Sequence, residues 1–202
     1  LSAIRIIACH LGTGGSSVAA ISHGTSIDTS MGYTPLAGLM MSTRTGDIDP
    51  MLPLHMQTEL GFTPQELNRI LNKESGLLGV SGFSSDLRDI EKQMATNNRA
   101  RLAFEMYTYR LKQYIGAYIA TLGGVDVLIF TDDIGVKSWQ VRHAVCNSLS
   151  FCGIILDNER NRTVSQKDIS DISSTDSTTS ILVMPTDEES VICREGIALL
   201  AK

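Results

Sequence analysis

The chain opens with a short apolar segment that runs directly into a glycine-rich turn. Residues 4–9 are apolar and rich in β-branched side chains, which is typical of a buried strand. Residues 10–17, His-Leu-Gly-Thr-Gly-Gly-Ser-Ser, follow at once, and two further strand patterns over 18–22 and 25–28 flank a turn at 23–24. Because a strand rather than a helix follows the glycines, we predict a β-meander whose first loop exposes much of its backbone.

The rest of the chain is predicted to be helical, with two more buried strands. We expect helices over residues 51–60, 64–73, 85–95 and 99–122. Two later strands, over 125–131 and 181–184, each precede a helix, over 138–152 and 187–201, and a loop over 132–137 joins the first of these pairs. This order predicts an α/β domain in which helices pack on a mixed sheet.

Composition narrows the classes of partner. The formal net charge of −5 argues against a broad nucleic-acid surface, which needs clustered Lys and Arg. The chain contains neither an apolar run near the roughly 20 residues that cross a bilayer nor an opening signal peptide, so we expect a cytoplasmic protein without a membrane segment. The cysteines show no CxxC spacing and are expected to be reduced and structural, with Cys9 and Cys193 buried in apolar runs.

The glycine-rich turn is a candidate phosphate cradle. Phosphate oxygens need several converging N–H donors, and Gly12, Gly14 and Gly15 let the backbone approach without a Cβ in the way. The turn is not a Walker A motif, because the next element is a strand and no Gly-Lys-Ser/Thr follows. A tight turn without function, with His10 as an ordinary loop histidine, is the alternative.

A second candidate is Arg44, which lies in a segment without helical or strand period over residues 29–50. Long ordered segments of this kind are usually functional. The guanidinium fork matches phosphate or carboxylate oxygens and can stabilise charge on a transferring phosphoryl group. The alternative is a plain salt bridge of Arg44 with Asp47 or Asp49.

The ends of the later strands supply a third candidate. Ligands of open α/β sheets sit beyond the carboxyl ends of strands, where residues 132–137 and 185–189 both lie. Glu188 or Glu189 could hold Mg²⁺, since nucleotide-bound magnesium takes one or two carboxylates. Alternatively, both are acidic residues favoured at a helix start by the helix dipole.

Several segments, in one register, resemble the acetate kinase family. They begin at Met31 (MGYTPLAGL), Ser42 (STRTGDIDP), Lys73 (KESGLLG), Ser84 (SSDLRD), Tyr114 (YIGAY), Phe130 (FT) and Pro185 (PTDEE). These matches run through the whole chain but cover only the C-terminal half of the family's protein. The first residue is Leu1 rather than an initiator Met, and we therefore expect a fragment whose upstream half is missing.

The resemblance implies an actin-like, ribonuclease-H-like fold of the acetate and sugar kinase superfamily. Residues 1–202 would form a single C-terminal lobe for nucleotide binding and dimerisation, with the N-terminal lobe absent. The implied reaction is reversible phosphoryl transfer between ATP and acetate, giving acetyl phosphate and ADP, with Mg²⁺ (or Mn²⁺). This half alone would be inactive, because the carboxylate pocket and the family's catalytic aspartate belong to the other half. The implied partners are the N-terminal half, acetate or a similar short-chain acid, and a second copy in a homodimer.

The resemblance also assigns roles to individual residues. The loop that faces the nucleotide phosphates would be His10, Leu11, Gly12, Thr13 and Gly14. Arg44 looks like the arginine that stabilises the transition state. The segment beside the adenine would be Asp86, Leu87 and Arg88, and the other adenosine-contacting loop would be Asp133, Ile134, Gly135, Val136 and Lys137. Glu188 matches the family's magnesium-associated glutamate.

Two departures from the family pattern concern the nucleotide. Thr13 replaces the usual Asn of the phosphate loop, and one extra residue precedes Val18. Asp133 stands where a glycine usually lets the nucleotide approach, and Lys137 replaces an Asn and could pair with it. The alternatives to an ATP-dependent acetate kinase are therefore a non-catalytic nucleotide-binding or dimerisation module, or a kinase for another short acid such as propionate or another donor such as pyrophosphate.

Overall fold

The computed structural model describes residues 4–200, which build a six-stranded sheet in the order β3-β2-β1-β4-β6-β5. Strand β1 (Arg5–Leu11) pairs antiparallel with β2 (Ser16–Ser22), and β2 with β3 (Thr25–Thr29). On its other side β1 pairs parallel with β4 (Val127–Thr131), and β4 with β6 (Ser180–Met184). The short β5 (Ser170–Asp171) is antiparallel to β6. The predicted opening meander and mixed sheet are confirmed.

The parallel strands β1, β4 and β6 end at one edge of the sheet. His10 is level with Thr131, and Thr131 with Met184. The segments that follow these strands are the glycine-rich turn, helix α6 (Asp132–Lys137) and helix α9 (Glu188–Leu200). The carboxyl ends of parallel strands are where open α/β sheets place their ligands, so the topology brings the sequence-predicted segments to one edge.

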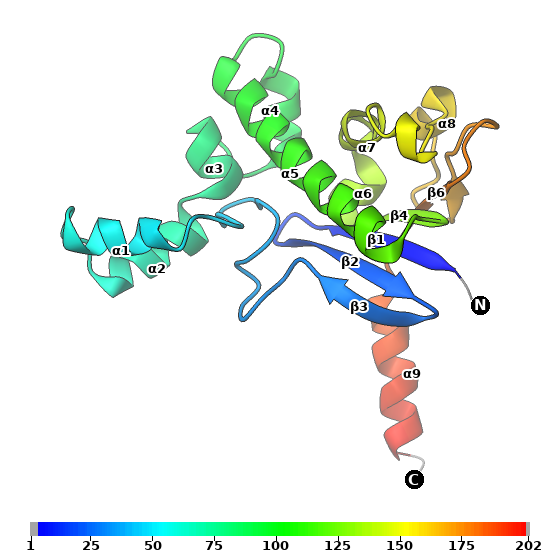
Figure 1. Ribbon diagram of the computed structural model, residues 1–202, viewed down its shortest axis with the longest axis horizontal. Coiled ribbons are helices and arrows are strands. Elements are labelled where there is room, and N and C mark those ends of the chain that lie inside the picture. The colour runs from blue at the N-terminus through cyan, green and yellow to red at the C-terminus, as the bar shows by residue number, and fades with distance from the viewer. Residues whose placement is uncertain (1–3, 201–202) are drawn as a thin grey trace.

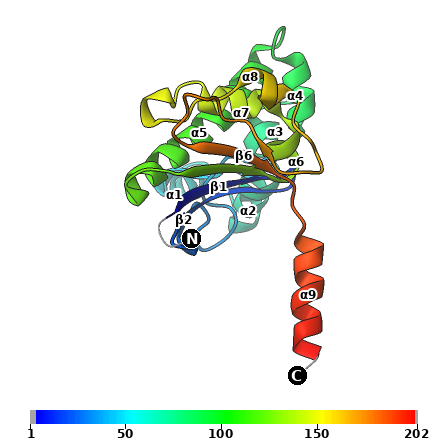
Figure 2. The same ribbon diagram turned by 90° about the vertical axis from the view of Figure 1, so that its right-hand side faces the viewer.

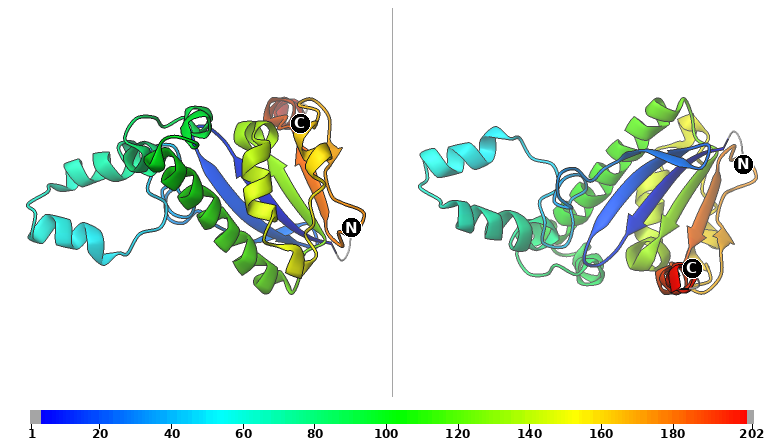
Figure 3. Two further views of the ribbon diagram at one scale, coloured as in Figure 1. Left: turned by 90° about the horizontal axis from the view of Figure 1, so that it is seen from above. Right: turned by 90° about the horizontal axis from the view of Figure 1, so that it is seen from below.

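The helices gather mainly on one face of this sheet. They are α1 (Met51–Thr58), α2 (Pro64–Lys73), α3 (Gly76–Ser81), α4 (Leu87–Gln93), α5 (Asn98–Leu122), α7 (Trp139–Cys146) and α8 (Asn158–Arg162). Figure 2 shows α5, α7 and α8 on the same side of the strands. Helices α1 and α2 extend beyond the sheet (Figure 3).

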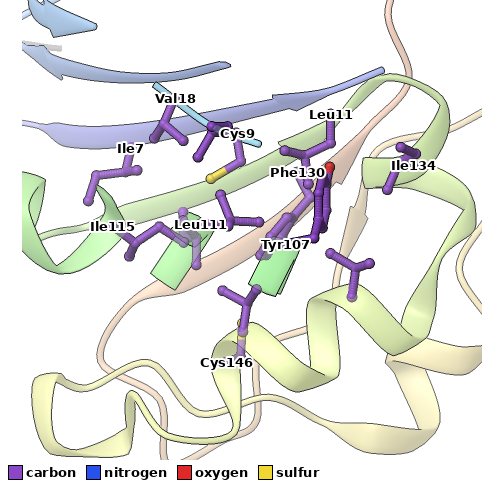
Figure 4. Packing of buried hydrophobic residues seen from close by; sticks show 14 of the residues in the cluster. Ile7, Cys9, Leu11, Val18, Tyr107, Leu111, Ile115, Phe130, Ile134 and Cys146 are labelled. Atoms are coloured by element: carbon purple, nitrogen blue, oxygen red, sulfur yellow. The ribbon is translucent and has the colours of Figure 1, made fainter. Parts of the chain in front are cut away.

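The core lies between β1, β4 and the long helix α5. Ile7, Cys9 and Leu11 are alternate residues of β1 and are fully buried. They face α5 residues spaced four apart, Tyr107, Leu111 and Ile115 (Figure 4). A strand period of two facing a helix period near four is the pattern of a sheet covered by a helix.

The predicted helices are present, and so is the capping box between Thr63 and Glu66. The helix predicted over residues 138–152 ends at Cys146, however, and α3 and α8 were not predicted. The loop predicted over residues 132–137 was wrong, because α6 begins there directly after β4. Asp132 makes the turn with φ 65°, a left-handed conformation that Asp tolerates better than most residues. Its Oδ1 then accepts the Asp133 N–H at 2.7 Å, which satisfies a free donor of the first helical turn.

Helix α9 projects away from the sheet (Figure 1). It spans Glu188–Leu200, and Ala201, the predicted last residue, lies outside the described residues. Cys193 is therefore exposed, so its predicted burial was wrong. All four cysteines are free, and burial raises the pKa of the Cys146 thiol to about 12. Within residues 4–200, no helix is long and apolar enough to cross a bilayer.

Candidate phosphate site at the strand ends

The glycine-rich turn joins β1 to β2 and holds its shape with one internal hydrogen bond. The Gly12 N–H donates to the Gly15 carbonyl at 2.9 Å. A Cβ on Gly12 would lie 2.9 Å from that carbonyl oxygen and would also overlap the Asp132 carboxylate, so only glycine fits there. Among the described residues, the N–H groups of Thr13, Gly14 and Gly15 donate to no other group. Three neighbouring backbone donors are thus left for an anion.

Arg44 lies over the second half of this turn. Its Nη1 is 3.3 Å from the position a Cβ would take on Gly15, and the Ser42 hydroxyl donates to the Thr13 carbonyl. These contacts bring the segment around residues 42–44 against the turn, although the two are about 30 residues apart in the sequence. A guanidinium therefore lies beside the turn that carries three open N–H groups.

The salt bridge considered for Arg44 does not form. Among residues 4–200, the ion pairs leave Arg44 without a carboxylate partner, and its nearest polar contact is the Met41 sulfur at 3.8 Å. Asp47 is instead occupied by the Tyr114 hydroxyl at 2.6 Å and by the Gly38 N–H at 2.7 Å. The cation beside the turn is consequently uncompensated, as a site for a phosphoryl group requires.

His10 and Asp132 face each other at the first half of the turn. The His10 Nε2 lies 3.1 Å from Asp132 Oδ2, and both side chains are about one-third exposed, at 38% and 31%. His10 is thus part of the strand end and contacts a carboxylate, rather than standing free in a loop. His10 was predicted as a site residue, whereas Asp132 was predicted only as part of the candidate segment 132–137.

Most of the residues expected to contact adenosine line one small cavity of about 160 Å³. Its lining is Thr13, Asp86, Leu87, Arg88, Glu91, Asp133, Ile134, Lys137 and Ser138. The predicted Gly135 and Val136 are buried residues of α6 outside this lining, although Val136 lines a second cavity, of about 230 Å³, and Leu11 is in the core. Glu91 and Ser138 were not predicted, since nothing in their local sequence distinguishes them. Burial raises the pKa of the Glu91 carboxyl, which accepts a hydrogen bond from the Ser138 hydroxyl.

The charged groups around this cavity are paired with one another. Arg88 donates to both Asp86 oxygens, and this hydrogen bonding lowers the pKa of Asp86. Lys137 Nζ lies 2.5 Å from Asp133 Oδ1, so the pairing considered for these two residues is confirmed. Each cation at this end already has its anion within the same helix or helix start.

A buried arginine holds α6 in place from behind. Arg142 is 1% exposed and donates to the Gly135 and Val136 carbonyls at 2.7 and 2.8 Å. It also donates to the Asn161 side chain and carbonyl, both at 2.7 Å. Desolvation lowers the pKa of Arg142 to about 10. Because its acceptors are carbonyl oxygens, this cation fixes the last turn of α6 against α7 and α8.

Glu188 is the first residue of α9 and is exposed. The described part of the chain holds no group of three or more His, Cys, Asp or Glu side chains arranged to bind a metal. A single exposed carboxylate fits a metal that takes most of its ligands from phosphates and water, and does not form a complete protein site. Glu188 is not brought into contact with the other predicted residues.

Comparison with known proteins gives one consistent result. The sequence matches the model of the acetokinase family over residues 1–194. It is 48% identical over 200 residues to acetate kinase from Dictyoglomus turgidum, covering 98% of this chain and 49% of that one. The crystal structure of Porphyromonas gingivalis acetate kinase superposes with a TM-score of 0.93 at 43% identity, covering 98% and 50%. A propionate kinase from Francisella tularensis superposes with a TM-score of 0.86 at 36% identity, covering 94% and 48%. The chain spans about half the length of the curated relatives it matches.

Proposed function

The chain belongs to the acetokinase family, and on that premise we propose that it supplies the phosphate and nucleotide half of an enzyme that transfers a phosphoryl group reversibly between ATP and acetate. The observation that supports this most is the unpaired Arg44 guanidinium over a turn with three open N–H groups. Because the chain spans about half of its relatives, the other half would supply the acid-binding side.

The residues present favour catalysis by positioning and charge neutralisation. The open N–H groups of Thr13, Gly14 and Gly15 would hold the donor phosphates, and the turn's glycines let those phosphates approach the backbone. Arg44 would neutralise charge that spreads over the oxygens of the transferring group as it leaves one oxygen and joins another. Both contributions come from groups already in place, so little reorganisation is needed during the reaction.

Mg²⁺ (or Mn²⁺) is the metal we propose for this site, because it would neutralise negative charge on the donor phosphates. Glu188 is the residue of this chain proposed to assist it, directly or through water. The exposed position of that carboxylate is compatible with a metal carried in by the donor phosphates.

For the phosphoryl donor, the space around Asp133 favours an alternative to ATP. The two cavities beside Asp133 are about 160 and 230 Å³, each below the roughly 300–1,000 Å³ of usual small-molecule sites. The Asp133–Lys137 pair lines the space expected to receive the base. ATP would therefore be held mainly through its phosphates, and a donor without a base, such as pyrophosphate, is the second candidate.

The acceptor is proposed to be acetate or a similar short-chain acid. Both an acetate kinase and a propionate kinase superpose well on this chain, so this half does not separate the two acids. The acid pocket and the catalytic acid–base group are assigned to the other half. This half alone is accordingly proposed to be inactive.

A homodimer is proposed on the basis of an exposed apolar stripe on α5. Leu102, Met106 and Tyr109 are 50%, 44% and 62% exposed and lie on one face of the helix. Met106 and Tyr109 also line a groove of about 580 Å³ between α3, α5 and the segment at residues 45–48. A second copy covering this stripe would remove it from water. If the chain bound nucleotide and dimerised without catalysis, it would instead be a binding module.

The direct test joins this chain to its other half and measures acyl phosphate formation, trapped as the hydroxamate. We expect turnover with acetate, ATP and Mg²⁺ by the complete protein, and none by residues 1–202 alone. Propionate and pyrophosphate serve as the second acid and the second donor. A correctly folded complete protein that transfers no phosphoryl group with any of these pairs would refute the kinase and leave the binding module.

A further inference from the structure

The first half of the phosphate turn is occupied by a carboxylate of the chain itself. Asp132 Oδ2 lies against Gly12 so closely that a Cβ on that glycine would overlap it, and against His10 Nε2 at 3.1 Å. Arg44 lies over Gly15 at the other half of the same turn. The turn therefore has a cation on one side and an anion on the other.

Asp132 is held in this position by its backbone. Its φ of 65° directs the chain from β4 into α6, and its Oδ1 accepts the Asp133 N–H at 2.7 Å. The second oxygen, Oδ2, is left to face the turn and His10. One carboxylate thus shapes the start of α6 and places negative charge beside the open N–H groups.

We propose that Asp132 lowers donor affinity as a built-in anion at the phosphate turn, weakening the binding of every phosphate-bearing donor regardless of its base. The proposal rests on the proposed function, because it assumes that donor phosphates occupy the turn. The Arg44 guanidinium would attract the donor phosphates, whereas the Asp132 carboxylate would repel them. A site with this balance releases its phosphorylated products readily and needs a metal or high donor concentration to fill.

Asp132 differs in this respect from its neighbour Asp133. Asp133 is paired with Lys137 at 2.5 Å and lines the cavity expected to receive the base. Asp132 has no Lys or Arg partner among the described residues and lies at the turn, although it shares the lining of a second cavity, of about 230 Å³, with Asp133. Removing charge at position 132 should act on any phosphate ligand, whereas removing it at position 133 should act on ligands that carry a base.

The test uses the complete protein and two probes that differ only by a base-bearing group, pyrophosphate and ADP, titrated by calorimetry with and without Mg²⁺. Asp132→Asn keeps the shape and tolerates a left-handed φ while removing the charge. We expect Asp132→Asn to tighten both probes about tenfold at low salt, with a smaller gain at high salt. Asp133→Asn is the matched control and should tighten ADP alone.

Asp132→Gly provides a second variant, because glycine accepts the positive φ without strain, and it should show the same gain. Unchanged affinity of both variants for pyrophosphate would overturn the proposal. If the Asp132 variants bound the probes more weakly, and only in the presence of Mg²⁺, the proposal would also be overturned, because Asp132 would then be a metal ligand. Phosphoryl transfer by the unaltered protein is measured alongside: its absence refutes the proposed function, whereas normal transfer with unchanged probe affinities refutes only this role of Asp132.

Discussion

The two ends of the candidate site use their charged residues in opposite ways. At the phosphate end, within the described residues, the Arg44 guanidinium lacks a carboxylate partner and the N–H groups of Thr13, Gly14 and Gly15 lack acceptors. At the base end, Asp86 is paired with Arg88 and Asp133 with Lys137, around a cavity of only about 160 Å³. Polar groups without a partner in the protein are free to bind a ligand. The phosphate end has such groups, whereas the charged groups at the base end are already paired with one another.

The largest effect is expected at the unpaired cation. In the complete enzyme, Arg44→Ala should lower kcat by roughly 10³-fold, because arginines that neutralise a transferring phosphoryl group contribute on that order. Steady-state turnover measures it, with unfolding by urea as a check on folding. The control is Arg101→Ala, which removes an exposed arginine on helix α5 and should change neither kcat nor stability. An Arg44→Ala enzyme with normal kcat would refute the role of Arg44 in neutralising the transferring phosphoryl group.

The next effect concerns the support of the base end. Arg142→Met should lower the free energy of unfolding by about 3 kcal/mol, because it leaves buried carbonyl groups of α6 and Asn161 without donors. It should also raise KM for the nucleotide more than it changes kcat, since α6 lines the cavity. The exposed Arg160→Met is the control for loss of an arginine. A change below about 1 kcal/mol would mean that α6 is held by other contacts.

Substitutions of two glycines in the turn distinguish a glycine needed for the fold from one that contacts the ligand. Gly12→Ala should destabilise the fold by about 1–3 kcal/mol, because the new Cβ meets the Gly15 carbonyl and the Asp132 carboxylate. A Cβ on Gly14 meets nothing within 4 Å, so Gly14→Ala should leave stability nearly unchanged. If Gly14→Ala nevertheless weakens pyrophosphate binding, Gly14 faces the ligand. Equal stability of the two variants would show that Gly12 is not under the predicted constraint.

The smallest effect is a pH-dependent one at the base end. The folded-state pKa of Glu91 is raised by burial, so its ionisation costs stability as pH rises above the ordinary glutamate range. Glu91→Gln removes that cost, and we expect it to stabilise the protein at pH 8 and hardly at all at pH 4. Urea midpoints at the two pH values measure this. The exposed Glu105→Gln is the control, and an equal effect at both pH values would contradict the assignment to ionisation.

Local patterns predicted the elements well but could not predict contacts that depend on strand pairing. The alternation in β1, the capping box at Thr63 and the glycine-flanked Arg44 were all readable, because each signal lies within a few residues. The contact of Asp132 with His10 exists only because β1 and β4 are neighbours, more than 100 residues apart in the sequence.

Two other differences have equally physical causes. Arg142 belongs to a type that is mostly exposed, and only the carbonyl ends of α6 and Asn161 make its burial favourable. Cys193 lies in an apolar run, but α9 projects from the sheet, so the run is not covered by the described residues. An apolar run in the sequence is buried only where another element packs against it, and the tertiary structure decides whether one does.

The contrast between the two ends is tested most directly by comparing pyrophosphate with ADP as ligands of the complete protein, in the presence of Mg²⁺. The two share the diphosphate, so the ratio of their dissociation constants isolates what the adenosine adds. We predict that adenosine improves binding by less than about tenfold, or about 1.4 kcal/mol. An improvement of about a hundredfold or more would show that the base end is a full binding site, contradicting the account.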